Sequence, residues 1–266
     1  MNAISNRDYK FDGNIISGSL FHEFIFKPWD WYRKVFLGLD RFEGNMSSRI
    51  GDIVHYCAYM ADINKKPDVE LIKNYLKESM QKFDSYKTFD EYFEDIKLIA
   101  ETLINDYVLR YKGLEFEKTF KCKFDDETLF CGRIDRIEGA KNNAIIVDYK
   151  THSKSLGIKK IDINHKIQLL FYAFLLKKNG YNPKAIKLIY INRPLGGEIS
   201  EKTGKRLKYY PPKVQVFEEF ISNEDFEFIE NQIKLCYDKI LLSRERKDLL
   251  HIIWHDPRLK KENNYE

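Results

Sequence analysis

The residues from Glu115 to Thr151 limit the possible folds of this chain more than any other segment. Apolar and polar residues alternate through EFEKTFKCKF, TLFCGRIDRI and AIIVDYKT, and the short segments DDE and EGAKNN join these three runs. A period of two is the pattern of a β-strand, so we predict three successive strands here. A chain with three adjoining strands of this length is built around a β-sheet.

The other segments predict helices around this sheet and two more strands. Before the three strands, we predict a helix that starts near Ser19 and breaks at Pro28, followed by helices over 47–61, 68–83 and 89–111. After them we predict a helix over 164–178, strands over 185–192 and 213–220, and a final helix from about Ser222. This order predicts an α/β protein, with a central mixed β-sheet flanked by helices and a helical insertion near the N-terminus. No repeat or low-complexity linker divides the chain, so we expect one domain over 1–266. Its parts would be a mainly helical part (1–113), the sheet core (114–220) and a C-terminal helix and tail (221–266).

Composition limits what the chain can bind. Its 266 residues are 43% hydrophobic, and 45 basic against 41 acidic residues leave a formal charge of only +4. Any surface for nucleic acid must therefore be a local patch. No apolar run reaches the length of a membrane span, and the start of the chain lacks the apolar centre of a signal peptide. We expect an intracellular, cytoplasmic protein without membrane contact.

Charged residues interrupt two of the predicted strands. Residues two apart share a face of a strand, so Asp148 and Lys150 project to one side, and Asp135 on the preceding strand can reach the same edge. Carboxylates that converge in a core are costly unless something neutralises them, and hard oxygen ligands favour Mg²⁺ or Mn²⁺. The alternative is a structural Asp–Lys ion pair at a strand end, because a lone DxK tripeptide is common by chance.

Further motifs accompany this pair in a fixed order. Gly132-Arg133-Ile134-Asp135-Arg136 has the form GxxDR, Asp148-Tyr149-Lys150-Thr151 the form DxKT, Gln168 and Tyr172 the form QxxxY, and Gly51 and His55 the form GxxxH. As a set they resemble the PD-(D/E)xK nuclease superfamily, in particular the RecB/AddB-like and CRISPR-associated exonuclease-like branch. The resemblance implies a restriction-endonuclease-like core. It also implies a metal-dependent DNA exonuclease acting on single-stranded or frayed ends, in recombination, repair, or phage- or CRISPR-type DNA processing.

The resemblance also implies roles for individual residues. His55, Asp135, Asp148 and the backbone carbonyl of Tyr149 would hold a Mg²⁺ or Mn²⁺ ion. Asp135, Asp148, Lys150, Gln168 and Tyr172 would form the catalytic set. Several relatives hold an iron–sulfur cluster, but Lys27 stands where a cysteine would precede Pro28 and the tail has no cysteine, so we expect no cluster. Glu117 is a further candidate near the metal, although Glu115 would share its orientation.

Basic and aromatic residues suggest where DNA could bind. Lys205, Arg206 and Tyr209 lie in KTGKRLKYYPPK, and Lys166 lies in the helix that carries Gln168. These side chains could track phosphates and stack on unpaired bases, but a solvated hairpin tip is an equal interpretation. No helicase motif is present, so a helicase or recombination partner would be a separate chain.

Two other functions compete with an exonuclease. The first is a catalytically idle member of the fold that only binds nucleic acid, and the second is a structure-specific or restriction-type endonuclease. Metal binding separates the first alternative from an enzyme, and cleavage of closed circular DNA separates the second from an exonuclease.

Overall fold

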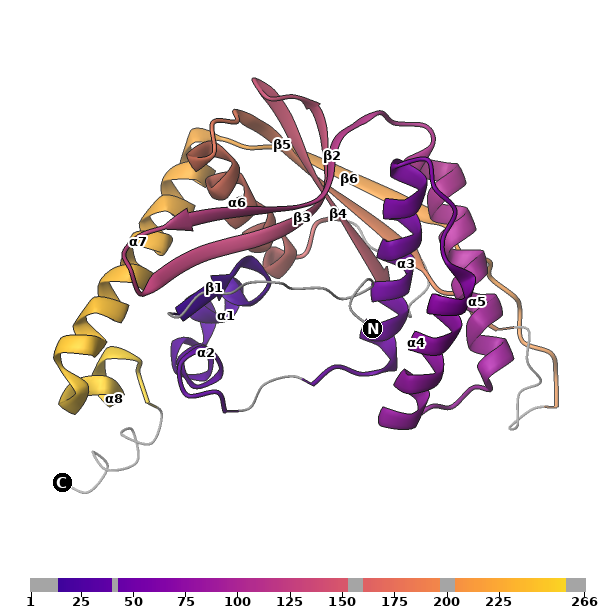
Figure 1. Ribbon diagram of the computed structural model, residues 1–266, viewed down its shortest axis with the longest axis horizontal. Helices are drawn as coiled ribbons and strands as arrows, with labels where there is room; N and C mark the ends of the chain where they lie inside the picture. The colour runs from indigo at the N-terminus through magenta and orange to yellow at the C-terminus, as the bar shows by residue number, and fades with distance from the viewer. Residues whose placement is uncertain (1–13, 40–42, 153–159, 197–203, 257–266) are drawn as a thin grey trace.

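A computed structural model describes residues 14–39, 43–152, 160–196 and 204–256 of the chain. Its centre is a mixed sheet with helices on both faces (Figure 1), as the sequence predicts, and the sheet has six strands where the sequence indicated five. The strands are β1 (Asn14–Ser17), β2 (Gly113–Lys123), β3 (Thr128–Ala140), β4 (Asn143–His152), β5 (Pro183–Asn192) and β6 (Val214–Phe220). Their order is β1-β3-β4-β5-β6, and β2 pairs with β3.

Strand β3 has two different neighbours along one edge, and this arrangement opens the sheet. β1 pairs with Thr128–Cys131 in parallel, and β4 pairs antiparallel with β3 only between Arg136 and Ala140. Residues 132–135 of β3 lie between these two ladders. The last residues of β4, from Asp148 on, continue to pair with β5 alone. The GxxDR and DxK motifs therefore both lie where the strands separate.

One face of the sheet carries five helices. They are α1 (Gly18–Phe26), α2 (Pro28–Val35), α6 (Ile163–Lys178), α7 (Asn223–Glu245) and α8 (Leu250–Ile253), with a short 3-10 turn (Lys247–Leu249) between the last two. Every residue of α6 from Ile167 to Leu176 is buried, because the sheet, α1 and α7 surround it. Helix α7 begins with a capping box, in which the Ser222 and Asp225 side chains accept hydrogen bonds from each other's backbone N–H groups.

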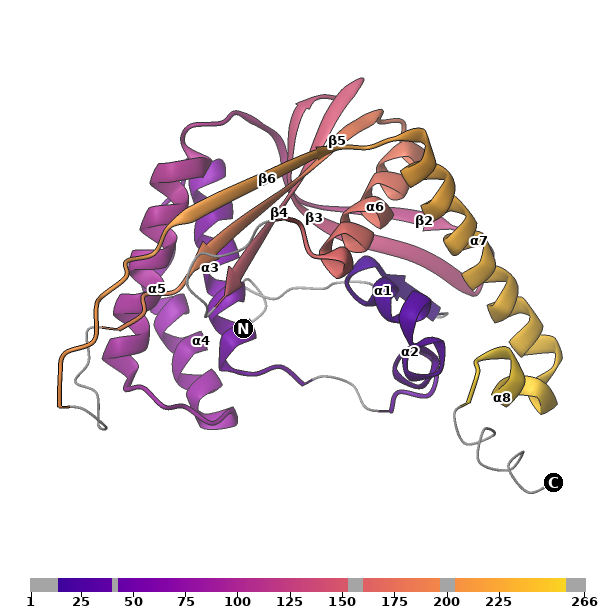
Figure 2. The ribbon, with the colours of Figure 1, turned by 180° about the vertical axis from the view of Figure 1, so that it is seen from behind.

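The other face carries the N-terminal helical arm. It consists of α3 (Met46–Asp62), α4 (Val69–Lys82), α5 (Phe89–Leu103) and a π-helical turn (Ile104–Val108). The helix predicted over 89–111 thus leaves α-geometry at Leu103. Val147, Tyr149, Ile189 and Ile191 of the sheet join the apolar core of this arm. Seen from behind, the arm stands at the opposite end of the molecule from α7 and α8 (Figure 2).

Aromatic packing joins the first helices to the end of the chain. The Trp254 ring stacks on Tyr32 at 4.8 Å between centroids, and lies 5.5 Å from the ring of Trp31. Trp31 and Trp254 are fully buried, and the Trp254 indole N–H donates to Ser243 Oγ at 2.7 Å. These contacts hold α2 against α7 and α8. Within the described ranges, no helix combines the length and the apolar character that a bilayer crossing requires.

Candidate active site

The DxK motif places an ion pair at the open end of β4. Lys150 Nζ lies 2.6 Å from Asp148 Oδ2, and Gln168 Nε2 lies 3.5 Å from Asp148 Oδ1. Gln168 also donates to the Tyr172 hydroxyl at 2.8 Å. The four side chains therefore form one connected row between β4 and α6.

Strand β3 and helix α3 bring a second set of groups to the opposite side of Tyr149. His55 Nδ1 lies 3.3 Å from Asp135 Oδ2, and His55 Nε2 lies 2.8 Å from the Tyr149 carbonyl oxygen. The same Asp135 oxygen accepts the Tyr149 backbone N–H at 2.9 Å. One residue of β4 is thus held by both its N–H and its carbonyl group.

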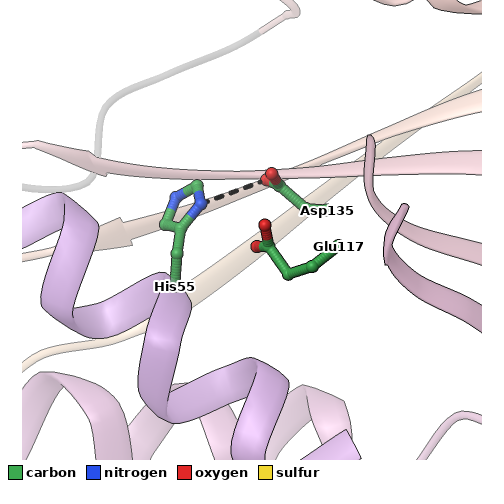
Figure 3. A group of neighbouring side chains, drawn as sticks. All are labelled: His55, Glu117 and Asp135. Carbon is green, nitrogen blue, oxygen red and sulfur yellow. Dashed lines mark ion pairs between the residues drawn. The ribbon is translucent and has the colours of Figure 1, made fainter. Parts of the chain in front are cut away.

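Glu117 of β2 completes a cluster that could hold a metal ion. His55, Glu117 and Asp135 each offer a ligand atom, and these atoms lie within 4.8 Å of one another (Figure 3). Glu117 adopts a left-handed backbone conformation with φ +45°, which is uncommon for a residue other than glycine. Its carboxylate also meets Arg133 Nε at 2.9 Å.

The sequence offered Glu117 as a candidate near the metal but gave Glu115 the same predicted orientation, and the structure separates the two carboxylates. Glu115 accepts hydrogen bonds from Lys118 at 2.7 Å and from the Tyr181 hydroxyl at 2.6 Å, so it contacts the segment after α6 and is not one of the three ligand groups of the cluster. The positive φ at Glu117 is the local feature that distinguishes the two carboxylates, and a period of two could not reveal it.

The predicted metal-binding residues divide between the two sets. His55, Asp135 and the Tyr149 carbonyl lie together with Glu117. Asp148 is turned toward Lys150 and Gln168 and, among the residues that the structure describes, lies outside the group of ligand atoms within 4.8 Å. His55 and Asp148 are nevertheless linked through one residue. His55 contacts the Tyr149 carbonyl oxygen, and Asp148 directly precedes Tyr149 in β4.

Electrostatics link the two sets. Burial alone would lower the pKa of His55, but the carboxylates of Asp135 and Glu117 outweigh it and raise this pKa to about 9. Burial and the Asp135 charge raise the pKa of Glu117 to about 7, against the effect of Arg133. Burial also raises the pKa of Asp148, although Lys150 opposes the shift. Several buried carboxylates thus share a site with two cationic groups, an environment that a divalent cation would relieve.

Glycines allow the helices to approach the site. A Cβ atom on Gly132 would lie 2.5 Å from Tyr172 Cε1, and one on Gly18 would lie 2.6 Å from the same atom. The Tyr172 ring therefore fits only against bare backbone. On the other face, Gly51 lies one turn before His55 in α3. A Cβ atom on Gly51 would lie 3.3 Å from Thr151 Oγ1.

The predicted DNA-binding residues lie on α6 and in the segment between β5 and β6. Lys166 pairs with Glu219 at 3.1 Å and with Asp225 at 3.3 Å. Lys205, Arg206 and Tyr209 are exposed, whereas Lys202 and Thr203 of the same segment lie outside the described residues. Tyr209 also lines a cavity of about 1110 Å³ between α5 and the chain after β5.

A mixed sheet that opens onto carboxylates, a histidine and a lysine is the arrangement that the resemblance to a nuclease core leads us to expect. Comparison with protein families agrees, because the sequence model of the PD-(D/E)XK nuclease superfamily matches residues 16–240. The chain therefore belongs to the PD-(D/E)XK nuclease superfamily. No curated protein matches the chain significantly.

A solved structure shares the fold. A protein from Eubacterium rectale that is assigned as an exonuclease superposes with a TM-score of 0.55 at 12% identity, over 87% of this chain and 82% of its own. A phage-related exonuclease from Haemophilus somnus 129PT has a TM-score of 0.34 at 13% identity, over 67% of this chain and 89% of its own. At this identity the likeness to the first structure concerns the fold alone, and the TM-score of the second is too low to indicate a shared fold.

Proposed function

We propose that this chain is a divalent-metal-dependent deoxyribonuclease of the RecB/AddB-like branch. It would act as an exonuclease on single-stranded or frayed DNA ends, with Mg²⁺ or Mn²⁺ as its metal. The observation that supports this proposal is the position of the Lys150 ammonium. It lies 2.6 Å from Asp148, next to the residue whose carbonyl contacts His55 at 2.8 Å.

The donor atoms suit a hard divalent cation. Two carboxylates, a backbone carbonyl and an imidazole converge from β2, β3, β4 and α3. Oxygen donors with one imidazole are compatible with Mn²⁺ and acceptable to Mg²⁺. We propose that His55, Glu117, Asp135 and the Tyr149 carbonyl would hold the ion, and that Asp148 would join them as the resemblance implies. When bound, such an ion supplies Lewis-acid stabilisation of phosphoryl charge and a water of lowered pKa.

Residues of the chain itself would prepare the reaction. Asp148 and Asp135 outweigh burial and raise the pKa of Lys150, so its ammonium stays charged and can stabilise negative charge on a phosphoryl group or orient the attacking water. Gln168 bridges the Asp148 carboxylate and the Tyr172 hydroxyl, which fixes the orientation of both. We propose that Gln168 and Tyr172 act through this orientation and through contact with the substrate phosphate.

Exposed basic and aromatic groups would guide the strand. Lys205 and Arg206 carry positive charge at the surface, and Tyr209 offers a half-exposed ring for base stacking. Lys166 is a weaker candidate because two carboxylates already pair with it.

An end-labelled DNA assay tests this proposal. Single-stranded DNA, duplex DNA and a closed circle would be incubated with Mn²⁺ or Mg²⁺, with and without EDTA. We expect metal-dependent shortening of linear DNA and no cutting of the circle. Asp148→Ala and Lys150→Ala should each abolish shortening, because the ion pair at the cleavage centre is lost.

Matched controls exist in a second Asp–Lys pair. Lys123 and Asp126 lie 2.6 Å apart on the exposed β2–β3 turn, so Lys123→Ala and Asp126→Ala should keep full activity. Cutting of the circle would assign the chain as an endonuclease. A wild-type chain that binds single-stranded DNA but cleaves nothing would identify it as an idle binding member of the superfamily.

A further inference from the structure

Arg136 is a fully buried arginine that follows Asp135 in β3. Its guanidinium donates to Asp62 Oδ1 and to the Tyr111 carbonyl, and its Nε lies 3.0 Å from Glu138 Oε1. The Val108 carbonyl lies 3.5 Å from the same guanidinium. A buried charge of this kind links α3, the end of the arm and the sheet.

The contact between Arg136 and α3 lies beside the contact between His55 and Asp135. Asp135 contacts His55 and Arg136 contacts Asp62, so two consecutive residues of β3 meet two residues of α3. His55 and Asp62 are seven residues apart, which is about two turns of an α-helix, and they therefore share one face. Helix α3 is thus fixed to β3 at two points.

The π-helical turn supplies another part of this link. A single turn of π-helix (Ile104–Val108) ends α5, and the Tyr107 hydroxyl donates to Glu138 Oε1 at 2.9 Å. Glu138 also accepts from Lys187 at 2.9 Å. Such turns often occur at functional sites. Here the Val108 carbonyl at the end of the turn and the Tyr111 carbonyl just after it both face the Arg136 guanidinium of β3.

Apolar packing alone does not fix the position of α3 along the sheet. Ile50, Val54 and Ala58 face the arm core, and contacts between such side chains are non-directional. A shift of α3 by one turn, about 5.4 Å, would exchange one apolar row for the next. The same shift would separate Arg136 from Asp62 and leave both charges buried without each other, which is strongly unfavourable.

We propose that Asp62 and Arg136 set the register of α3 on the sheet and thereby position His55 for metal binding. The pair acts through α3 and does not touch the substrate. This inference rests on the proposed function, because it concerns the metal site of the nuclease.

Mn²⁺ titration by calorimetry tests the role of the pair. In Asp62→Leu and in Arg136→Lys we expect the dissociation constant for Mn²⁺ to rise about 10-fold to 100-fold, as for other residues that orient metal ligands. Thermal unfolding of each variant would be recorded beside the titration. Lysine at 136 keeps the charge but cannot reach Asp62 and the Tyr111 carbonyl together, so it tests the geometry if Asp62→Leu fails to fold.

Arg49→Gln provides the matched control on the same helix. Arg49 bonds Asp52 and Tyr75 on the α4 side of α3 and touches no residue of the metal cluster. We expect its loss to lower the melting temperature and leave Mn²⁺ affinity unchanged. Wild-type Mn²⁺ affinity in folded Asp62→Leu or in folded Arg136→Lys would overturn the positioning role. An absence of Mn²⁺ binding to the wild type would instead overturn the metal site and the proposed function together.

Discussion

The Tyr172 ring packs against the backbone of Gly132, and a Cβ atom added there would lie 2.5 Å from Tyr172 Cε1. This contact explains in physical terms why the GxxDR motif begins with glycine. Tyr172 holds Gln168, and Gln168 reaches Asp148, so the spacing of β3 and α6 determines the position of a carboxylate at the site.

Gly132→Ala should therefore lower activity, although Gly132 has no side chain that could take part in the reaction. The added methyl group must displace the Tyr172 ring, and such overpacking costs about 1–3 kcal/mol of stability. We expect a lower urea midpoint and at least a tenfold loss of DNA cleavage in single-turnover assays. A second change, Tyr172→Leu, removes the ring atoms that clash and should restore stability but not activity. Full activity of folded Gly132→Ala would show that this contact does not position the site.

Much of the fold could be predicted from local pattern. The alternation in β2, β3 and β4 and the caps of α7 depend on residues close in sequence, and the structure confirms the α/β fold with a mixed sheet that they indicate. Strand β1 was missed because it has only four residues, and its partner begins at Thr128, more than a hundred residues later. No local pattern encodes so short a parallel pairing.

The site was harder to predict than the fold. The spacing of Asp148 and Lys150 was enough to place both on one face of β4, where they form an ion pair. The resemblance pointed to Glu117 as a candidate near the metal, but the pattern of the strand could not separate it from Glu115, because the left-handed φ of +45° at Glu117 and the partners of Glu115 are properties of the folded chain. The partners of Arg136 come from α3 and the end of α5, which the motif itself does not specify.

Glu117→Gln should weaken metal binding, whereas Glu115→Gln should not. Glu117 is one of the three groups whose ligand atoms lie within 4.8 Å of one another, and the amide removes its charge without changing its size. We expect the dissociation constant for Mn²⁺ to rise about tenfold or more in calorimetry. Glu115→Gln is the control, because that carboxylate contacts Lys118 and Tyr181 instead. Equal affinities in the two variants would remove Glu117 from the metal site.

Trp254→Ala should destabilise the chain strongly. The ring is fully buried and packs against Tyr32 and Trp31. Loss of a buried tryptophan leaves a large cavity, so we expect the free energy of unfolding in urea to fall by about 3–5 kcal/mol. Trp29→Ala is a useful comparison, because Trp29 is only partly buried at the margin of the same core. It should cost less than half as much, and equal losses would contradict a central role for Trp254.

The pH dependence of the free energy of unfolding should show how far the ionised form of Asp62 destabilises the folded chain. Burial raises the pKa of Asp62 from 3.8 to about 6, because desolvation outweighs the attraction of Arg136. The folded chain therefore binds a proton at Asp62 more tightly than the unfolded chain does. Stability from this group is fully present below pH 3.8 and is lost as the pH rises through about 6.

Asp62→Asn removes this titration and serves as the reference. Between pH 7.5 and pH 5, we expect the free energy of unfolding of the wild type to gain about 1 kcal/mol relative to Asp62→Asn. Urea unfolding of both proteins at each pH measures the difference. A gain of this sign means that the ionised pair with Arg136 is retained at neutral pH despite its cost, as a positioning role requires. A wild type that instead loses stability relative to Asp62→Asn on acidification would show that the pair is kept for stability.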